Sequence, residues 1–352
     1  MKRALPLMTG LAVVLLLSSC TAGSPGPTTT SAAPSAPSSS STSGTGTTGA
    51  KRPNIVFVLT DDLAMNLISR MPHVVGLQKA GETMSQYRVV DSLCCPSRTS
   101  IFTGEYPHDD GVFTNSGSDG GYAAYNSHGN QPKTFALALQ KAGYRTGFMG
   151  KYLNGYKVTD PVPAGWNEWD VAGQGGYKEF GYNLNENGKK QHYGKAASDY
   201  LVDVLAKKGS SFIDSSVTAK QPFMLEVATF APHAPYTPAP RYANAAASVP
   251  YPKTSAYDTL PTDPPSWLKG RTALTTAQQA SIKKAYDKRV EADMAVDDLI
   301  GTLEGELKAK GVSNDTYVVF SSDNGYHMGE YRLLPGKQTA FDTDIHLSLI
   351  HI

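Results

Sequence analysis

The feature that most restricts the fold is a set of four short apolar runs, separated from one another by helical patterns. The first run, Asn54–Thr60, is continuously apolar and rich in β-branched residues, which is typical of a strand buried on both faces. The other three runs cover residues 144–149, 222–230 and 316–321. Apolar residues at helical spacing predict helices over residues 134–142, 196–215 and 277–310. This alternation predicts an α/β fold, with one large, mainly parallel sheet and helices on both of its faces.

Polar residues follow each of the four predicted strands. Asp61-Asp62 comes after the first strand, and the second leads to Gly150-Lys151. The third leads to Pro232-His233, and the fourth to Asp323-Asn324. Ligands of open α/β sheets bind outside the carboxyl ends of the strands. We therefore expect these carboxylates, the lysine and the histidine to surround one crevice.

Two of these clusters offer only oxygen ligands, and neither contains a histidine or a cysteine. They consist of Asp61, Asp62, Asp323 and Asn324. Such a set suits a hard divalent ion, Ca²⁺ or Mg²⁺, rather than zinc. The alternative is that each aspartate caps a following helix, but a matched pair of clusters after two strands favours the metal.

A dense motif, Cys94-Cys95-Pro96-Ser97-Arg98, precedes Thr103-Gly104. It predicts a helix of one to two turns, with Pro96 at the first helical position and Gly104 just after the end. Cys94 would then lie at the positive end of the helix, which favours an anion. Arg98, one turn further on, could reach back toward Cys94.

This motif resembles the signature of the formylglycine-dependent sulfatase family of the alkaline phosphatase superfamily, Cys-x-Pro-Ser-Arg followed by Thr-Gly. Further segments similar to that family are residues 52–62, 103–108, 150–154, 231–235 and 322–329. The double cysteine and Gly150-Lys-Tyr-Leu-Asn154 are most similar to the N-acetylglucosamine-6-sulfatase branch, with the extracellular heparan sulfatases close by. The resemblance covers about residues 51–346 and implies an alkaline-phosphatase-like fold.

The resemblance also implies a mechanism. A formylglycine-generating enzyme would oxidise Cys94, two residues before Pro96, and Cys95 would be the variable position. The hydrated aldehyde would attack sulfur, the alcohol would leave, and loss of sulfate would restore the aldehyde. Formylglycine at position 94 would bind Ca²⁺ together with the four oxygen ligands named above.

Four further residues would line the sulfate site by the same resemblance: Arg98, Lys151, His233 and Lys337. Positive charge is needed at the oxygens of a transferring sulfuryl group, and His233 is the expected proton donor to the leaving alcohol. His327 is a weaker candidate for the pocket. Many sulfatases have a histidine two residues after the lysine, where this chain has Leu153, a trait of the branch with Asn154.

The N-terminal residues predict export. Residues 1–20 have a basic start and a short apolar core, and they end at Cys20 in a sequence that resembles a bacterial lipobox. Residues 21–50 are almost wholly Ser, Thr, Gly, Pro and Ala, which predicts a disordered tether. A lipidated Cys20 would anchor the catalytic domain, residues 51–352, to the outer face of the bacterial cytoplasmic membrane. An ordinary cleaved signal would instead give a secreted protein.

The other end of the chain departs from the family pattern. After Ile345 the family continues with an apolar strand and a smaller C-terminal domain, whereas this chain ends with residues 346–352. We therefore expect a truncated catalytic domain in which the last strand of the large sheet and the smaller domain are absent.

Together these features predict a sulfuric ester hydrolase acting on sulfated sugars such as glycosaminoglycans. The net charge of +1 gives no reason to expect a nucleic-acid partner. The alternatives are a phosphonate or phosphate ester hydrolase of the same superfamily and a non-catalytic glycan-binding lipoprotein. The sugar and the sulfate position depend on loops such as residues 155–195 and 234–275.

Overall fold

A nine-stranded mixed sheet organises the protein in the computed structural model, which describes residues 52–351. The predicted signal, the linker and the lipidated Cys20 lie outside the described residues. The strands are β1 (Asn54–Thr60), β2 (Glu82–Thr83), β3 (Arg145–Lys151), β4 (Glu168–Ala172), β5 (Asn183–Glu186), β6 (Lys189–His192), β7 (Phe223–Ala228), β8 (Thr316–Ser322) and β9 (Ile350–His351). Their order in the sheet is β2-β9-β8-β1-β7-β3-β4-β5-β6.

The centre of the sheet is parallel and its two edges are antiparallel. β8, β1, β7, β3 and β4 pair in parallel, while β9, β2, β5 and β6 join through antiparallel ladders. The four apolar runs of the sequence therefore became four adjacent central strands, and the predicted α/β class is confirmed. Thr60 lies opposite Ser322 in the register of β1 and β8, so the residues that follow these two strands lie side by side.

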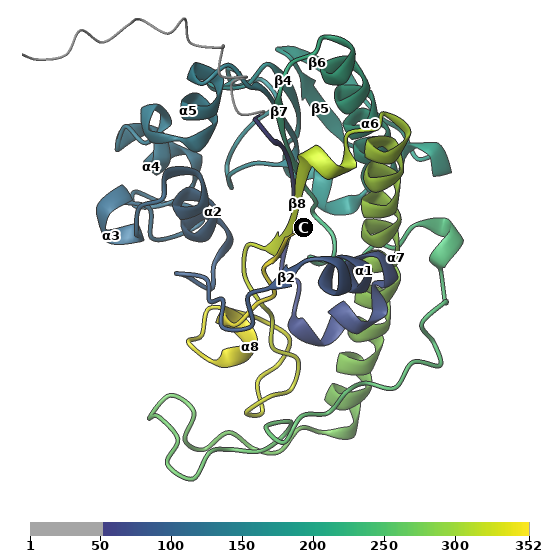
Figure 1. Ribbon diagram of the computed structural model, residues 1–352. Helices are drawn as coiled ribbons and strands as arrows, with labels where there is room; N and C mark the ends of the chain where they lie inside the picture. The colour runs from purple at the N-terminus through teal and green to yellow at the C-terminus, as the bar shows by residue number, and fades with distance from the viewer. Residues whose placement is uncertain (1–51, 352) are drawn as a thin grey trace, which may run out of the picture. The chain divides into compact units, whose positions relative to one another are not determined.

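The described residues form eight α-helices, and seven of them cover the two faces of the sheet. Helices α2 to α5 lie on one face, and α1, α6 and α7 lie on the other, with the short α8 near the end of the chain (Figure 1). The helices are α1 (Pro72–Ala80), α2 (Cys94–Thr103), α3 (Pro107–Asp110), α4 (Gly121–Ser127), α5 (Phe135–Lys141), α6 (Leu201–Thr218), α7 (Thr276–Ala309) and α8 (Asp342–Ile345). The 3-10 helices are η1 (Met65–Arg70), η2 (Gln131–Lys133), η3 (Gln174–Lys178), η4 (Ala197–Asp199), η5 (Pro240–Tyr242) and η6 (Ser313–Asp315).

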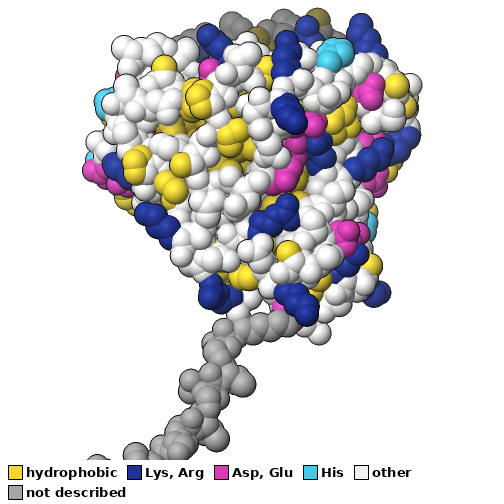
Figure 2. Space-filling model, turned by 90° about the horizontal axis from the view of Figure 1, so that it is seen from above, with side chains coloured by type: hydrophobic (Ala, Val, Ile, Leu, Met, Phe, Trp, Pro, Cys, Tyr) yellow, Lys and Arg dark blue, Asp and Glu magenta, His cyan; other side chains and the backbone are white. Residues whose placement is uncertain are grey.

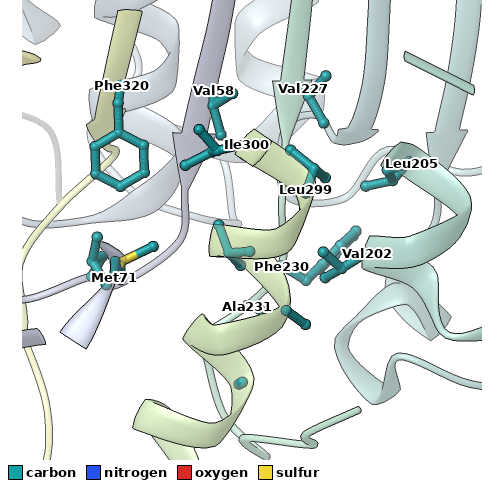
Figure 3. Packing of buried hydrophobic residues seen from close by; sticks show 14 of the residues in the cluster. Val58, Met71, Val202, Leu205, Val227, Phe230, Ala231, Leu299, Ile300 and Phe320 are labelled. Carbon is teal, nitrogen blue, oxygen red and sulfur yellow. The ribbon is translucent and has the colours of Figure 1, made fainter. Parts of the chain in front are cut away.

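Each face of the sheet has a hydrophobic core of its own, because strand side chains alternate between the faces. Val56 and Val58 of β1 contribute to the core beneath α1, α6 and α7, whereas Leu59 contributes to an aromatic core beneath α2, α4 and α5. In the first core, Leu299 and Ile300 of α7 lie against strand residues that include Val58, Val227 and Phe320 (Figure 3). The long helix α7 is therefore fixed to the central strands.

The start of helix α2 differs from the sequence-based expectation. Helix α2 has 10 residues and begins at Cys94, so Pro96 occupies the third helical position and not the first. A proline is tolerated there because the first-turn N–H groups have no partner within the helix. Gly104 does end the helix in the left-handed conformation, with φ of 72°. Residues 350–351 form β9, a two-residue strand antiparallel to β8, so this segment adds a short strand to the sheet.

Charges of both signs are interspersed on the face seen in Figure 2, where neutral and hydrophobic side chains separate them. Among the described residues, no helix has the combination of length and hydropathy that is needed to span a membrane.

Candidate active site

The carboxyl ends of four neighbouring strands, in the order β8, β1, β7 and β3, place the predicted residues together. Asp61 and Asp62 leave β1, and Asp323 and Asn324 leave β8 beside them. Lys151 is the last residue of β3, because the strand continues two residues beyond its predicted end at residue 149. The predicted residues therefore lie together at this edge of the sheet, a region that we call the crevice.

The four oxygen-bearing residues are almost completely buried, with exposed fractions of 0–1%. The backbone N–H of Asp62 donates to Oδ1 of Asp323 at 3.2 Å, and Nδ2 of Asn324 donates to Oδ1 of Asp62 at 2.7 Å. Ligand atoms of Asp61, Asp62, Cys94 and His233 all lie within 4.8 Å of one another. Three buried carboxylates and an amide that converge in this way fit a hard cation such as Ca²⁺.

Cys94 begins α2 and points into this group of carboxylates. Its side chain is 1% exposed, and its Sγ lies 3.4 Å from Oδ1 of Asp61 and 2.7 Å from Nζ of Lys337. Burial, together with the nearby Asp61 carboxylate, raises the pKa of the Cys94 thiol. An unmodified Cys94 is therefore a protonated thiol, which is a weak nucleophile.

The expected anion site at the start of α2 is only partly open. The side chain of Asn115 accepts the backbone N–H of Cys95 at 2.8 Å, and Pro96 has no N–H to offer. Positive charge in the crevice therefore comes mainly from side chains and not from the helix terminus.

Three cations lie among the carboxylates, and each contacts one of them directly. Lys151 pairs with Asp61, Lys337 pairs with Asp62, and Nε of Arg98 donates to Oδ2 of Asp323 at 2.7 Å. Arg98 is fully buried and also donates from Nη1 to the backbone oxygen of Lys151 at 2.7 Å. It therefore points toward Asp323 and Lys151, and no hydrogen bond joins it to Cys94.

These cations control the protonation of the site. Burial opposes ionisation of Asp62, but Lys337 and His233 lower its pKa below the usual value. Burial also opposes ionisation of Asp323, but Arg98, Lys151 and Lys337 keep its pKa far below the usual range. Both carboxyls therefore stay ionised at neutral pH, as metal ligands must be.

His233 lies at the open side of the crevice, with its side chain 25% exposed. Its Nδ1 is 2.7 Å from the backbone oxygen of Ala234, so this nitrogen carries a hydrogen and donates it. Its Nε2 lies 3.6 Å from Oδ2 of Asp62. This arrangement points Nε2 toward the buried carboxylate of Asp62.

The structure does not place His327 with Asp61, Asp62, Cys94 and His233. His327 is buried, its Nδ1 lies 2.9 Å from Oδ2 of Asp344, and its backbone N–H donates to Gly336 at 2.9 Å. Because Gly336 precedes Lys337, His327 supports the segment that carries this lysine.

Sequence reasoning missed Tyr177, which lies in η3. Its ring centroid is 4.7 Å from that of His233 and 5.1 Å from Nζ of Lys151. Asn154 donates to its hydroxyl at 3.3 Å, and both residues line a pocket that also includes Lys151. The Gly-rich segment around Tyr177 carried no motif, although its place after β4, at the same sheet edge, was a usable signal.

Comparisons with known proteins agree with this geometry. The family model described as "Sulfatase" matches residues 53–350. The N-acetylglucosamine-6-sulfatase of Homo sapiens is 36% identical over 316 residues, which are 86% of this chain and 56% of that protein. An extracellular sulfatase SULF-1 homolog of Drosophila melanogaster is 33% identical over 307 residues, covering 85% of this chain and 27% of the other. The chain thus spans about half, or less, of the length of these relatives.

A solved structure has the same fold, with a TM-score of 0.70 at 22% identity. The match covers 86% of this chain and 71% of the other, which was determined in complex with its substrate, D-glucosamine-2-N,6-O-disulfate.

Proposed function

The chain belongs to the sulfatase family, and on that premise we propose that it hydrolyses sulfate esters in the crevice at the carboxyl ends of β8, β1, β7 and β3. The observation that carries this proposal is the convergence of Cys94, the cations Arg98, Lys151 and Lys337, and His233 on one group of buried carboxylates. A tetrahedral anion needs such a set of fixed positive groups.

Asp61, Asp62, Asp323 and Asn324 would hold Ca²⁺, which would add positive charge beside position 94. The three carboxylates of this set are already balanced by Arg98, Lys151 and Lys337. Two extra positive charges would leave the lysine ammonium groups free to bind sulfate oxygens. The net charge of the site then suits a dianionic product.

Cys94 is the proposed site of oxidation to formylglycine, which would supply an electrophilic aldehyde in place of the thiol. Arg98 holds the start of α2 against Asp323 and the end of β3. Its role is to keep position 94 in register with the sulfate-binding lysines.

His233 is the proposed general acid. The hydrogen bond from Nδ1 to Ala234 fixes the ring, so Nε2 can carry the proton that the leaving alcohol requires. The partial exposure of this side chain gives a leaving group access from solvent.

The proposed substrate is a sulfated carbohydrate, as in the N-acetylglucosamine-6-sulfatase relative. Tyr177 offers an aromatic surface beside both Lys151 and His233, and Asn154 adds an amide beside its hydroxyl. Aromatic and amide groups of this kind suit a sugar, which has an apolar ring face and polar substituents.

The proposed place of action is outside the cytoplasm, with a lipid on Cys20 as the anchor. The support is the signal-like start of the sequence and a relative named as an extracellular sulfatase.

The test is to express the protein with a formylglycine-generating enzyme and measure its rates on an aryl sulfate and an aryl phosphate. Mass spectrometry of the Cys94 peptide should show the aldehyde, and the sulfate should be the faster substrate. A faster phosphate would favour the phosphonate or phosphate ester hydrolase. No turnover of either, with the aldehyde present, would favour a glycan-binding role. A panel of sulfated sugars that includes N-acetylglucosamine 6-sulfate then tests the substrate class.

A further inference from the structure

Arg289 of α7 is a buried arginine that belongs to no predicted motif. Its side chain has an exposed fraction of 0%, although α7 lies on the face of the sheet away from α2. No carboxylate pairs with it among the ion pairs of the described residues. Asp293, one turn further along α7, has no hydrogen-bond partner on either carboxylate oxygen. An arginine buried in this way needs compensation from other groups.

The compensation comes from three loops, and each of them carries a residue of the crevice. Nη2 of Arg289 donates to the backbone oxygen of Asp62, in the loop after β1. Nη1 donates to the backbone oxygen of Pro232 at 3.4 Å, in the loop after β7 and next to His233. The guanidinium carbon also lies 4.4 Å from the ring centroid of Tyr326, which follows Asn324 in the loop after β8.

A second aromatic ring closes this arrangement. Tyr236, from the loop after β7, lies 5.8 Å from the guanidinium carbon of Arg289, and its hydroxyl is 2.9 Å from the hydroxyl of Tyr326. Cations over aromatic faces are stabilised by the ring quadrupole, more strongly when both are desolvated. The two tyrosines therefore link the loops after β7 and β8 through the same guanidinium.

The backbone of Asp62 shows why this contact matters. Asp62 has φ of 66°, in the left-handed region that residues other than glycine seldom adopt. In this conformation its carbonyl oxygen points to Arg289 while its side chain points to Lys337 and Asn324. A donor fixed on the carbonyl oxygen helps to hold that backbone, and so the orientation of the carboxylate.

We infer that Arg289 is a positioning residue, which holds the metal-ligand loop of Asp62, the His233 loop and the Tyr326 loop in fixed relation to one another. It acts through backbone oxygens and ring faces and does not touch the reacting atoms. The planar guanidinium can serve two carbonyl groups and two ring faces at once, whereas the ammonium of a lysine cannot. The inference rests on the proposed function only for the naming of the ligands, since the contacts stand without it.

The test compares Arg289→Lys with Arg241→Lys, a matched control. Arg241 in η5 also contacts α7, but it pairs with Asp203 and Asp298 and touches no residue of the crevice. Hydrogen–deuterium exchange is measured for peptides that cover residues 60–66, 229–236 and 322–328, and Ca²⁺ binding is measured by calorimetry. Arg289→Lys should raise exchange in these loops and weaken Ca²⁺ binding about tenfold, while Arg241→Lys leaves both unchanged.

Equal exchange in the two variants would overturn the inference. If the unmutated protein binds no Ca²⁺, the proposed metal site fails, but exchange still decides the role of Arg289. If Arg289→Lys does not fold, Tyr326→Leu tests the same arrangement with Arg289 retained. Unaltered exchange in the loops after β1 and β7 of that variant would also overturn the inference.

Discussion

Two buried carboxyl groups, those of Asp323 and Glu226, lie near Arg98, but they differ in their hydrogen bonds and in their pKa values. Asp323, in the crevice, accepts a hydrogen bond from Nε of Arg98 at 2.7 Å. Glu226, beneath the crevice in β7, is influenced electrostatically by Arg98, but neither of its oxygens has a hydrogen-bond partner. Both side chains have an exposed fraction of 0%.

Their protonation diverges as a result. Arg98 and two lysines keep the pKa of Asp323 far below the usual range. Burial raises the pKa of Glu226 to about 8, and Arg98 offsets this only in part. Burial thus neutralises a carboxyl unless cations contact it. A buried acidic residue marks a reactive site here only where its charge is retained, so changes in the crevice should affect turnover and changes beneath it should affect stability.

The largest expected effect is at the reactive residue of the crevice. Cys94→Ala should abolish turnover, because no aldehyde can form at position 94. Cys95→Ala should keep most of the activity, since its side chain lies in the aromatic core and not in the crevice. Initial rates on an aryl sulfate check this prediction, with melting temperatures to show that both variants fold. Equal loss in both would contradict the assignment of position 94.

Removing the negative charge of Asp323 should lower the free energy of unfolding. Asp323→Asn leaves Arg98 and Lys151 without a full countercharge, and loss of one partner from a buried pair costs about 3–5 kcal/mol. Urea denaturation at pH 7 measures the loss of unfolding free energy. Asp298→Asn, which removes an exposed partner of Arg241, is the control and should change it little.

The two carboxyls should give opposite dependences of stability on pH. Glu226 binds its proton more tightly in the folded protein, so its contribution is complete below about pH 4.5 and is lost as the pH rises toward about 8. The slope within this window is about 1.4 kcal/mol per pH unit. Asp323, with its lowered pKa, contributes above the unfolded value, and that stability is lost in acid.

Denaturation curves of the unmutated protein and Glu226→Gln between pH 5 and pH 8 isolate the first effect. The unmutated protein should lose stability relative to the variant as the pH rises. A difference that stays constant with pH would show that Glu226 ionises normally.

The smallest of the four predicted effects is the stabilisation by Ca²⁺, which should bind only in the crevice. At ten times its Kd, Ca²⁺ should add about 1.4 kcal/mol to the free energy of unfolding. Thermal melts with Ca²⁺ and with a chelator measure this, and Asp323→Asn should show a smaller shift. An identical shift in both proteins would place the ion elsewhere.

The central sheet could be predicted from the sequence because its strands are largely buried and form short apolar runs. The edge strands β5 and β6 were not predicted, since polar segments such as Lys189–His192 have no strand-like pattern and depend on pairing with a neighbour. Pro96 was misplaced because the helix starts two residues earlier, where Asn115 from a distant loop accepts the Cys95 N–H. Contacts of this kind, distant in sequence, leave no local signal.

Part of the crevice was predictable for the same reason as the sheet, because Asp61, Asp62, His233, Asp323 and Asn324 follow strands. The contacts among these residues were not. Arg98 was expected to turn back to Cys94, but it binds Asp323 and the end of β3, which the register of the sheet brings within reach. Tyr177 lies in the 3-10 helix η3, and Arg289 lies in α7, on the opposite face of the sheet from α2. No sequence motif identifies either residue.

The burial of α2 has a consequence for the order of events in the life of the protein. Cys94 and Cys95 are at most 1% exposed, so an enzyme that must bind this segment cannot reach it once the domain has folded. The proposed oxidation of Cys94 therefore competes in time with folding. If this oxidation takes place, a molecule that folds before it would keep the Cys94 thiol.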